Sequence, residues 1–218
     1  MDSDLRRAWT KIVEGGDYDD HMAAVGQAQA AAELARDMIS EADLAPGSRL
    51  ILVGAGTGQL FDYLDPAFFG QFRIVCTDLN PDFLARLRQR LTARNLNALI
   101  VADDLEYTAL RTQPELLIVS LVLEHIDWRA GVKAIAAFHP AACGVVIQEN
   151  PPGMTSAVTP GRAVPASIAA AVQIARPTLV PQEELLGAFE SHGYRCKWTE
   201  ARAVADGKRL IGMLFIRE

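Results

Sequence analysis

Short apolar runs alternate with amphipathic segments through the middle of this chain. Strands that are buried on both faces read as continuous runs of Val, Ile and Leu, whereas half-exposed strands alternate with polar residues. The segments between the runs place apolar residues at helical spacing, as Phe83, Leu87 and Leu91 do. This order predicts an α/β fold in which a doubly wound parallel sheet carries helices on both faces. The predicted strands are residues 49–53, 73–77, 98–102, 115–121 and 144–148.

Several helices have clear boundaries in the sequence. Asn80-Pro81-Asp82 supplies a capping side chain, a proline in the first turn and an acid near the positive end of a helix. Gly193 is suited to end a helix that begins at Pro181, because glycine readily adopts the left-handed C-terminal conformation. Further helices are expected over residues 20–40, 57–69 and 128–138.

Two β-rich runs, residues 194–204 and 208–216, flank Ala205-Asp206-Gly207. Asp-Gly between such runs is a strong signal for a β-hairpin. The complete sheet is therefore expected to have about seven strands.

Composition narrows the choice of partners. The net charge is −6 and no cluster of Lys and Arg stands out, so no nucleic-acid partner is expected, because phosphates require clustered cations. Cys76, Cys143 and Cys196 are far apart, which favours buried thiols in a reducing, cytoplasmic compartment. The histidines lack metal-ligand spacing, so no metal is expected. No apolar run is long enough to cross a membrane, and the N-terminus lacks the apolar segment of a signal peptide.

A single domain with four parts is predicted. The parts are residues 1–45 as an N-terminal helical lid, 46–149 as a cofactor-binding core, 150–180 as a lid insertion, and 181–218 as a helix with the terminal hairpin. The insertion is rich in proline, which is excluded from central strands. It also carries Ile168 and Val172, whose apolar side chains need burial. We expect it to lie over the carboxyl ends of the strands, opposite the N-terminal helix.

The first predicted strand leads into Gly54, Gly56 and Gly58. Ligands of open α/β sheets bind at the carboxyl ends of the strands, and glycines there let a ligand approach the backbone and the N–H groups of the next helix. Asp78 ends the next strand, where a carboxylate can accept hydrogen bonds from both hydroxyls of a ribose. Dinucleotide-binding proteins favour G-x-G-x-x-G, but Gln59 occupies the position of the third glycine, and the glycines here follow G-x-G-x-G instead.

The G-x-G-x-G pattern resembles the class I S-adenosylmethionine-dependent methyltransferases. The resemblance continues in IVCTDLN at residues 74–80, VADDLE at 101–106 and LIVSLVLEHID at 117–127, which are similar to the second, third and fourth motifs of that family. It implies a Rossmann-like sheet whose last strand is antiparallel, and S-adenosyl-L-methionine as the cofactor. The residues that it implies at the cofactor are Gly54, Ala55, Gly56, Gly58, Asp78, Leu79, Asp103, Asp104, Leu105 and Ser120.

The same resemblance gives these residues roles. Asp78 would bind the ribose, and Leu79 would lie beside the adenine. In the third motif an aspartate accepts a hydrogen bond from the adenine amino group, and the next backbone N–H meets a ring nitrogen. Asp104 with Leu105 is the preferred match, and Asp103 is the alternative.

One position departs from the family pattern. Most members carry an acid two residues before the first glycine, where this chain has Leu52. That acid helps to order the methionine end of the cofactor, so its absence leaves room for a non-catalytic S-adenosylmethionine-binding protein. An NAD(P)-dependent oxidoreductase is the other alternative, which Gln59 and the terminal hairpin oppose.

The chemistry requires few protein groups. Methyl transfer from a sulfonium depends on orientation, and a base is needed only when the nucleophile arrives protonated. No obligatory catalytic residue follows from the sequence; His125 and Tyr18 are candidates for a base, and structural roles are favoured for Glu124 and His125. The short apolar lids favour a small organic substrate, methylated on oxygen, nitrogen or carbon, and either a monomer or a homodimer is compatible with the sequence.

Overall fold

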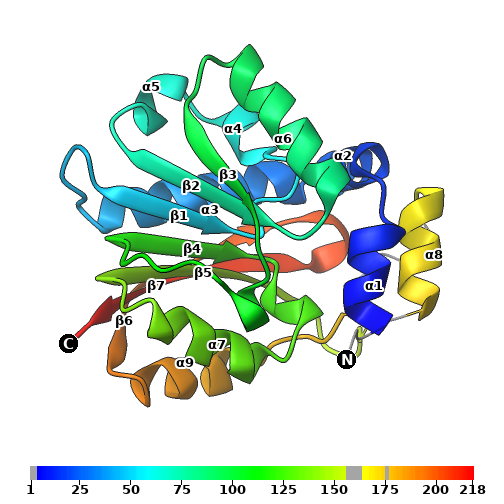
Figure 1. The fold of residues 1–218 in the computed structure, drawn as a ribbon. Helices are drawn as coiled ribbons and strands as arrows, with labels where there is room; N and C mark the ends of the chain where they lie inside the picture. Colours follow the sequence, from blue (N-terminus) through cyan, green and yellow to red (C-terminus); the bar gives the residue numbers. More distant parts are fainter. Residues whose placement is uncertain (1–3, 156–163, 175–176) are drawn as a thin grey trace.

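The computed structural model describes residues 4–155, 164–174 and 177–218. These residues form a seven-stranded sheet in the order β3-β2-β1-β4-β5-β7-β6 (Figure 1). The first five strands are parallel, and β7 is antiparallel to both of its neighbours. The predicted Rossmann-like sheet with an antiparallel last strand is thereby confirmed. The strands are β1 (Arg49–Val53), β2 (Arg73–Asp78), β3 (Ala98–Ala102), β4 (Leu116–Ser120), β5 (Ala142–Glu149), β6 (Tyr194–Ala203) and β7 (Arg209–Arg217).

Helices cover both faces of the sheet (Figure 1). Successive strand residues point to opposite faces, so Leu50 and Leu52 of β1 pack in one buried cluster and Ile51 and Val53 in another. The first cluster includes α3 (Gln27–Glu41), α4 (Leu60–Tyr63), α5 (Pro66–Phe69) and α6 (Pro81–Ala93). The second includes α7 (Trp128–Ala137) and α9 (Gln182–Glu190).

Three further helices form a small layer of their own. These are α1 (Asp4–Lys11), α2 (Gly15–Ala24) and α8 (Ala166–Ile174). α1 and α8 lie side by side (Figure 1), and Ala8, Ile168 and Ala171 share a buried cluster with Phe83 of α6. The described part of the predicted insertion thus adds a helix and no strand, while its residues 156–163 and 175–176 lie outside the described residues.

Two predicted helices are wrong as single elements. Residues 20–40 divide into α2 and α3, because Gly26 between them adopts a left-handed φ of 75° that no helix interior accommodates. Residues 57–69 contain only two single turns, α4 and α5. Leu64 is extended between them, and Asp65 caps a new turn that starts with Pro66. In both cases the apolar spacing was helical but a local backbone signal interrupts it.

Asn80 ties the N-terminal helices to the core. Its side-chain oxygen accepts hydrogen bonds from the backbone N–H groups of Asp82 and Phe83, at 2.9 and 3.3 Å, which confirms the predicted cap of α6. Its Nδ2 donates to the carbonyls of Trp9 and Val13, at 2.8 and 2.9 Å. One buried side chain therefore fixes the start of α6 and the end of α1 together.

Replacing Asn80 should separate these two roles. Asn80→Ala removes the cap and leaves two carbonyls without their donor, so we expect the free energy of unfolding to fall by about 2–4 kcal/mol. Asn80→Asp keeps the capping oxygen but loses both donors, so the amides of α1 should exchange faster while α6 stays protected. Hydrogen–deuterium exchange read by mass spectrometry checks this, and unchanged α1 exchange in Asn80→Asp would contradict it.

Candidate functional site

The turn after β1 contains three left-handed glycines. Gly54, Gly56 and Gly58 have φ angles of 63°, 58° and 81°, which are costly for any residue with a Cβ. Packing also requires glycine at two of these positions. A Cβ on Gly54 would collide with Val122, and a Cβ on Gly58 would collide with Leu87 of α6. Gly58 therefore serves helix packing, and it is not among the described residues that line the hollow beside this turn.

Asp78 is held at the end of β2 by the backbone. Its Oδ2 accepts a hydrogen bond from the N–H of Gly56 at 2.9 Å, and its Oδ1 accepts one from the N–H of Asn80 at 2.8 Å. Burial raises the pKa of this carboxyl group, and the backbone hydrogen bonds oppose that rise because they favour the charged form. The result is a carboxylate with a fixed orientation at the edge of a cavity.

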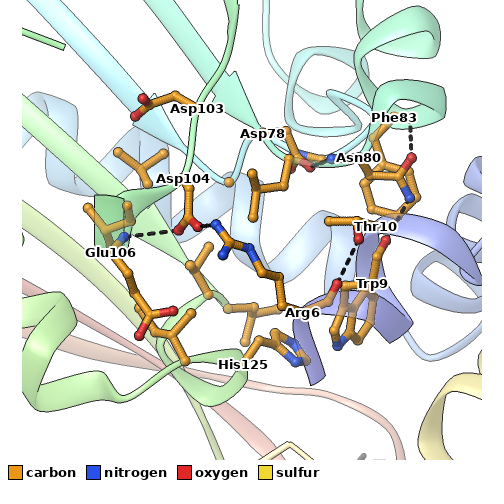
Figure 2. A pocket seen from close by; sticks show the side chains of 18 of the residues that line it. Arg6, Trp9, Thr10, Asp78, Asn80, Phe83, Asp103, Asp104, Glu106 and His125 are labelled. Carbon is orange, nitrogen blue, oxygen red and sulfur yellow. Dashed lines mark hydrogen bonds and ion pairs between the residues drawn. The ribbon is translucent and has the colours of Figure 1, made fainter. Parts of the chain in front are cut away.

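This cavity, the main hollow, lies between the glycine turn and α1 (Figure 2). Counted together with the open solvent at its mouth, it has about 840 Å³ of empty space. The predicted site residues that line it are Tyr18, Gly54, Gly56, Asp78, Leu79, Asp103, Asp104, Leu105, Ser120 and His125. The structure thus brings together side chains from the ends of β1, β2, β3 and β4.

The two aspartates of the third motif differ in orientation. Asp104 is buried, and its Oδ1 caps the short 3₁₀ helix Leu105–Tyr107 by accepting from the N–H of Glu106 at 3.0 Å. Figure 2 shows Asp104 directed toward Arg6 and Asp103 directed away from it. The Oδ1 of Asp103 instead accepts from the N–H of Ala109 at 3.1 Å. Asp104 is therefore the better placed of the two to meet a ligand in the main hollow.

α1 crosses the main hollow, which the sequence did not indicate residue by residue. Arg6 extends into the hollow and forms an ion pair with the Oδ2 of Asp104 (Figure 2). Trp9 lies edge-on to His125, with ring centroids 4.2 Å apart. Both residues line the hollow together with Thr10. Only the amphipathic character of residues 4–11 could have suggested that this helix covers an apolar surface.

α2 is fixed to the glycine turn by Asp19. Its carboxylate accepts a hydrogen bond from the hydroxyl of Thr57 and pairs with Arg90 of α6 at 3.2 Å. Its backbone carbonyl accepts from the side chain of Gln59 at 3.0 Å. Gln59, which takes the place where dinucleotide folds prefer glycine, therefore holds the helix that carries Tyr18 over Gly56.

Burial makes the two predicted candidates for a base poorly suited to that role. The pKa of Tyr18 is raised mainly by burial and further by the charges of Asp78 and Asp19, so its hydroxyl stays protonated at neutral pH. Burial lowers the pKa of His125 to about 3, so its imidazole is neutral but weakly basic. Both side chains can donate or accept a hydrogen bond in the hollow, and neither is tuned to take a proton at neutral pH.

Glu124, beside His125, has a different environment. Its side chain is only 3% exposed, and its Oε1 accepts from the backbone N–H of Gln148 at 2.8 Å. Its Oε2 is buried and has no hydrogen-bond partner among the described residues. Burial is the main cause that raises the pKa of Glu124 to about 7. Sequence analysis favoured a structural role for this residue, and its contact with Gln148 is structural, but the second oxygen remains available to a ligand.

Two smaller hollows adjoin the main one. The α8 hollow is bounded by Trp9, Met22, Glu124, Gln148, Ile168 and Val172. The α3 hollow is bounded by Ala28, Ala32, Leu52, Ala55, Ser120 and Leu121. Ala55 thus faces the α3 hollow rather than the main one, and Leu52, which replaces the usual acid of the family, contributes an apolar wall there.

Leu121 lies where all three hollows meet. It follows β4 with a left-handed φ of 54°, which is uncommon for a residue with a Cβ. Its N–H donates to the carbonyl of Val146 at 2.9 Å, which holds the strained turn in place. Strain of this kind is often found where a backbone must direct side chains around a site.

The described residues give no sign of a metal centre. Within residues 4–155, 164–174 and 177–218, no group of three His, Cys, Asp or Glu side chains could hold an ion. In that same part of the chain, no helix combines the length and apolar character needed to cross a bilayer.

The raised pKa of Glu124 can be tested through stability. Because its pKa is 4.5 in model compounds and about 7 in the folded chain, the folded state binds more protons between these values, and stability falls as pH rises through this window. Glu124→Gln removes this proton uptake while a side-chain oxygen can still accept from Gln148. Relative to the original chain, the variant should gain roughly 3 kcal/mol between pH 4 and pH 8, measured by chemical denaturation.

Burying the new amide can itself cost free energy, but that cost is the same at every pH. It would therefore shift the difference in free energy of unfolding between the variant and the original chain without changing how that difference varies with pH. Glu190→Gln, on the exposed surface of α9, is the matched control for the exchange of a carboxyl group for an amide. Parallel pH profiles for the original chain and Glu124→Gln would contradict the raised pKa.

Comparison with known proteins adds family information. A family model described as a methyltransferase domain matches residues 51–141, which run from β1 to the residue before β5 and include the glycine turn, Asp78 and Asp104. A comparison with curated proteins found no match.

Solved structures share the fold. Magnesium protoporphyrin IX methyltransferase from Synechocystis PCC 6803 with bound SAH has a TM-score of 0.68 and 15% identity, over 99% of this chain and 93% of that one. The N-methyltransferase NodS from Bradyrhizobium japonicum WM9 in complex with SAH has a TM-score of 0.61 and 13% identity, over 88% and 87%. The [4+2]-cyclase SpnF has a TM-score of 0.64 and 12% identity, over 84% and 79%.

Identities this low establish the shared fold and leave the reaction open, as the cyclase illustrates. The methyltransferase-domain match covers the segment that carries the glycine turn and the acids of the main hollow. Residues 51–141 are therefore similar to a methyltransferase domain, and the sheet order with its antiparallel β7 is the fold that these solved structures share.

Proposed function

We propose that this chain binds S-adenosyl-L-methionine in the main hollow and transfers its methyl group to a small organic molecule. The observation that carries the proposal is the carboxylate of Asp78, which two backbone N–H groups orient at the edge of a hollow that the glycine turn also lines. A carboxylate in this position suits the two hydroxyls of a ribose. Each of its oxygens already accepts one hydrogen bond and retains capacity for another.

The adenine end of the cofactor fits the residues beyond Asp78. Leu79 and Leu105 offer apolar contacts in the same hollow, and Asp104 offers a buried carboxylate to an amino group. Arg6 now pairs with that carboxylate, so the adenine amino group would take the place of the guanidinium. Asp103 remains the alternative acceptor, with the disadvantage that its carboxylate is turned toward Ala109.

The methionine end would lie near Gly54, Gly56 and Ser120, where the main and α3 hollows meet. The usual acid of the family is absent, and Leu52 makes this side apolar. Contacts to the charged end of the cofactor would therefore come from backbone groups of the glycine turn, Ala55 included.

When bound, S-adenosyl-L-methionine would supply an electrophilic methyl group. The chain would contribute orientation and exclusion of water, which can account for much of the acceleration of such a reaction. α1 and α2 cover the main hollow through Trp9 and Tyr18, and hydrogen bonds from Asn80 and to Asp19 hold both helices in place.

Substrate size and setting follow from the same features. The helices around the hollows leave small, partly apolar spaces, which suit a small organic acceptor and leave little room for a nucleic acid. A cytoplasmic setting is part of the proposal because Cys76 and Cys143 are free and buried thiols. A monomer or a homodimer would serve equally well.

Two alternatives are less well supported. A non-catalytic binding protein is compatible with Leu52, but it gives no role to the adjoining α8 hollow and its buried carboxylate. A nicotinamide-dependent oxidoreductase would favour a third glycine after the turn, where the following helix packs closely against the strand. Gln59 occupies that position here, and its side chain instead donates a hydrogen bond to α2.

The cofactor site can be tested by removing Asp78. Asp78→Ala should weaken binding of S-adenosylhomocysteine about ten- to hundredfold, because a hydrogen bond to a charged acceptor contributes about 1.5–3 kcal/mol. Isothermal titration calorimetry measures this, with Asp20→Ala, an exposed acid of α2, as the control that should bind normally. Normal affinity in Asp78→Ala, or binding of NAD in place of S-adenosylhomocysteine by the original chain, would overturn the proposal.

A further inference from the structure

The α8 hollow adjoins the main hollow through a shared wall. Trp9, Tyr18, Leu121 and His125 line both spaces. Counted together with the open solvent at its mouth, the α8 hollow has about 600 Å³ of empty space. A molecule in it would therefore lie next to a cofactor in the main hollow, where these four residues border both spaces.

Two polar side chains that line the α8 hollow have a buried atom without a hydrogen-bond partner among the described residues, namely Nδ1 of His125 and Oε2 of the Glu124 carboxylate. One carboxylate oxygen accepts from the N–H of Gln148, and the other is buried with no partner among the described residues. Leaving such an oxygen unpaired is costly, so it indicates that a donor is missing from the site. Gln148 is itself fixed, because its side-chain oxygen accepts from Gln27 at 2.7 Å.

The rest of the α8 hollow disfavours ions of either sign. Among the described residues that line it there is no Lys or Arg, and its apolar contacts come from Met22, Ile168 and Val172. The neighbouring titratable groups are Tyr18 and His21 of α2 and His125, while α8 contributes none. Burial raises the pKa of Tyr18 and lowers those of His21 and His125, so all three are neutral at pH 7.

Lys208 is a charged group that acts on one residue of this lining. It is buried, and its charge adds to the lowering of the His21 pKa. It does not line the hollow, so, among the described residues, an acceptor with a carboxylate or a phosphate would find no Lys or Arg in the lining. An ammonium group would enter a space that already penalises charge on Glu124 and on both histidines.

We propose that the α8 hollow binds the methyl acceptor as a small, neutral, largely apolar molecule with a phenol-type hydroxyl, and that Glu124 receives the proton of that hydroxyl. This inference rests on the proposed function. The acceptor oxygen forms a bond to the methyl carbon, and the carbon–sulfur bond breaks with its electron pair remaining on sulfur. The O–H bond breaks as well, and the proton moves to the carboxylate of Glu124, so atoms and charge balance.

Binding of a model acceptor provides a first test. The probes are para-ethylphenol, para-ethylbenzoate and para-ethylbenzylamine, which share one apolar body and differ in charge. With S-adenosylhomocysteine at saturation, calorimetry should show binding of the phenol at least tenfold tighter than of either ion. Tighter binding of the benzoate or the benzylamine would overturn the neutral, hydroxyl-bearing acceptor.

Two substitutions on α8 locate the binding site. Val172 lines the hollow and is half-buried, so Val172→Trp should fill the space and weaken para-ethylphenol binding at least tenfold. Ile174, two positions further on the same helix and 41% exposed, is the matched control, and Ile174→Trp should bind the phenol normally. Both variants should bind S-adenosylhomocysteine as the original chain does. Equal phenol affinity in the two variants would place the acceptor elsewhere.

Glu124→Gln tests the proton transfer. It can still accept from Gln148, so para-ethylphenol should bind within about threefold of normal while its methylation slows about a hundredfold or more. The rate for the original chain should rise with pH through about 7, where Glu124 becomes charged, and the variant should lack this rise. A retained rate, or a retained rise with pH, would exclude Glu124 as the base.

The outcomes separate this inference from the proposed function. If the original chain fails to bind S-adenosylhomocysteine, the proposed function fails. If it binds S-adenosylhomocysteine but neither binds nor methylates the phenol, the acceptor assignment fails while the cofactor site stands.

Discussion

The hydrogen bond from Gly56 to Asp78 joins the ends of two adjacent strands, and the site depends on it. The turn can present this N–H only because its glycines adopt left-handed angles. The carboxylate that accepts it is buried, so its charge is tolerable only with donors on both oxygens. The sheet thus defines one anionic position, and the hollows, the covering helices and the neighbouring acids are arranged around it.

The covering helices are attached by polar contacts at a few points. Asn80 binds the end of α1, and Asp82 accepts from the N–H of Gly15 at 2.6 Å. Asp17 of α2 in turn accepts from the N–H of Ser167 at 2.9 Å, near the start of α8. These bonds connect residues far apart in the sequence, so the three helices hold one another over the strands although their shared apolar cluster is small.

The sequence was sufficient for the sheet because its strands are continuous apolar runs, which have few other stable arrangements. It was also sufficient to predict where Asp78 and the glycine turn lie, because their positions at the strand ends depend on a few residues that are adjacent in the sequence. It could not place Arg6, Trp9 or Glu124, because their positions depend on long-range contacts with Asp104, His125 and Gln148. It also misjudged two helices, where Gly26 and Pro66 outweighed the apolar spacing around them.

The ion pair between Arg6 and Asp104 links ligand binding to the position of α1. The guanidinium lies in the main hollow, so a ligand that takes its position at Asp104 binds only those molecules in which Arg6 has withdrawn. The measured affinity is then the intrinsic affinity multiplied by the fraction of molecules in that state. A substitution in α1 that does not contact the ligand could therefore still change the apparent affinity. It would do so by changing the fraction of molecules in which the guanidinium of Arg6 has left Asp104.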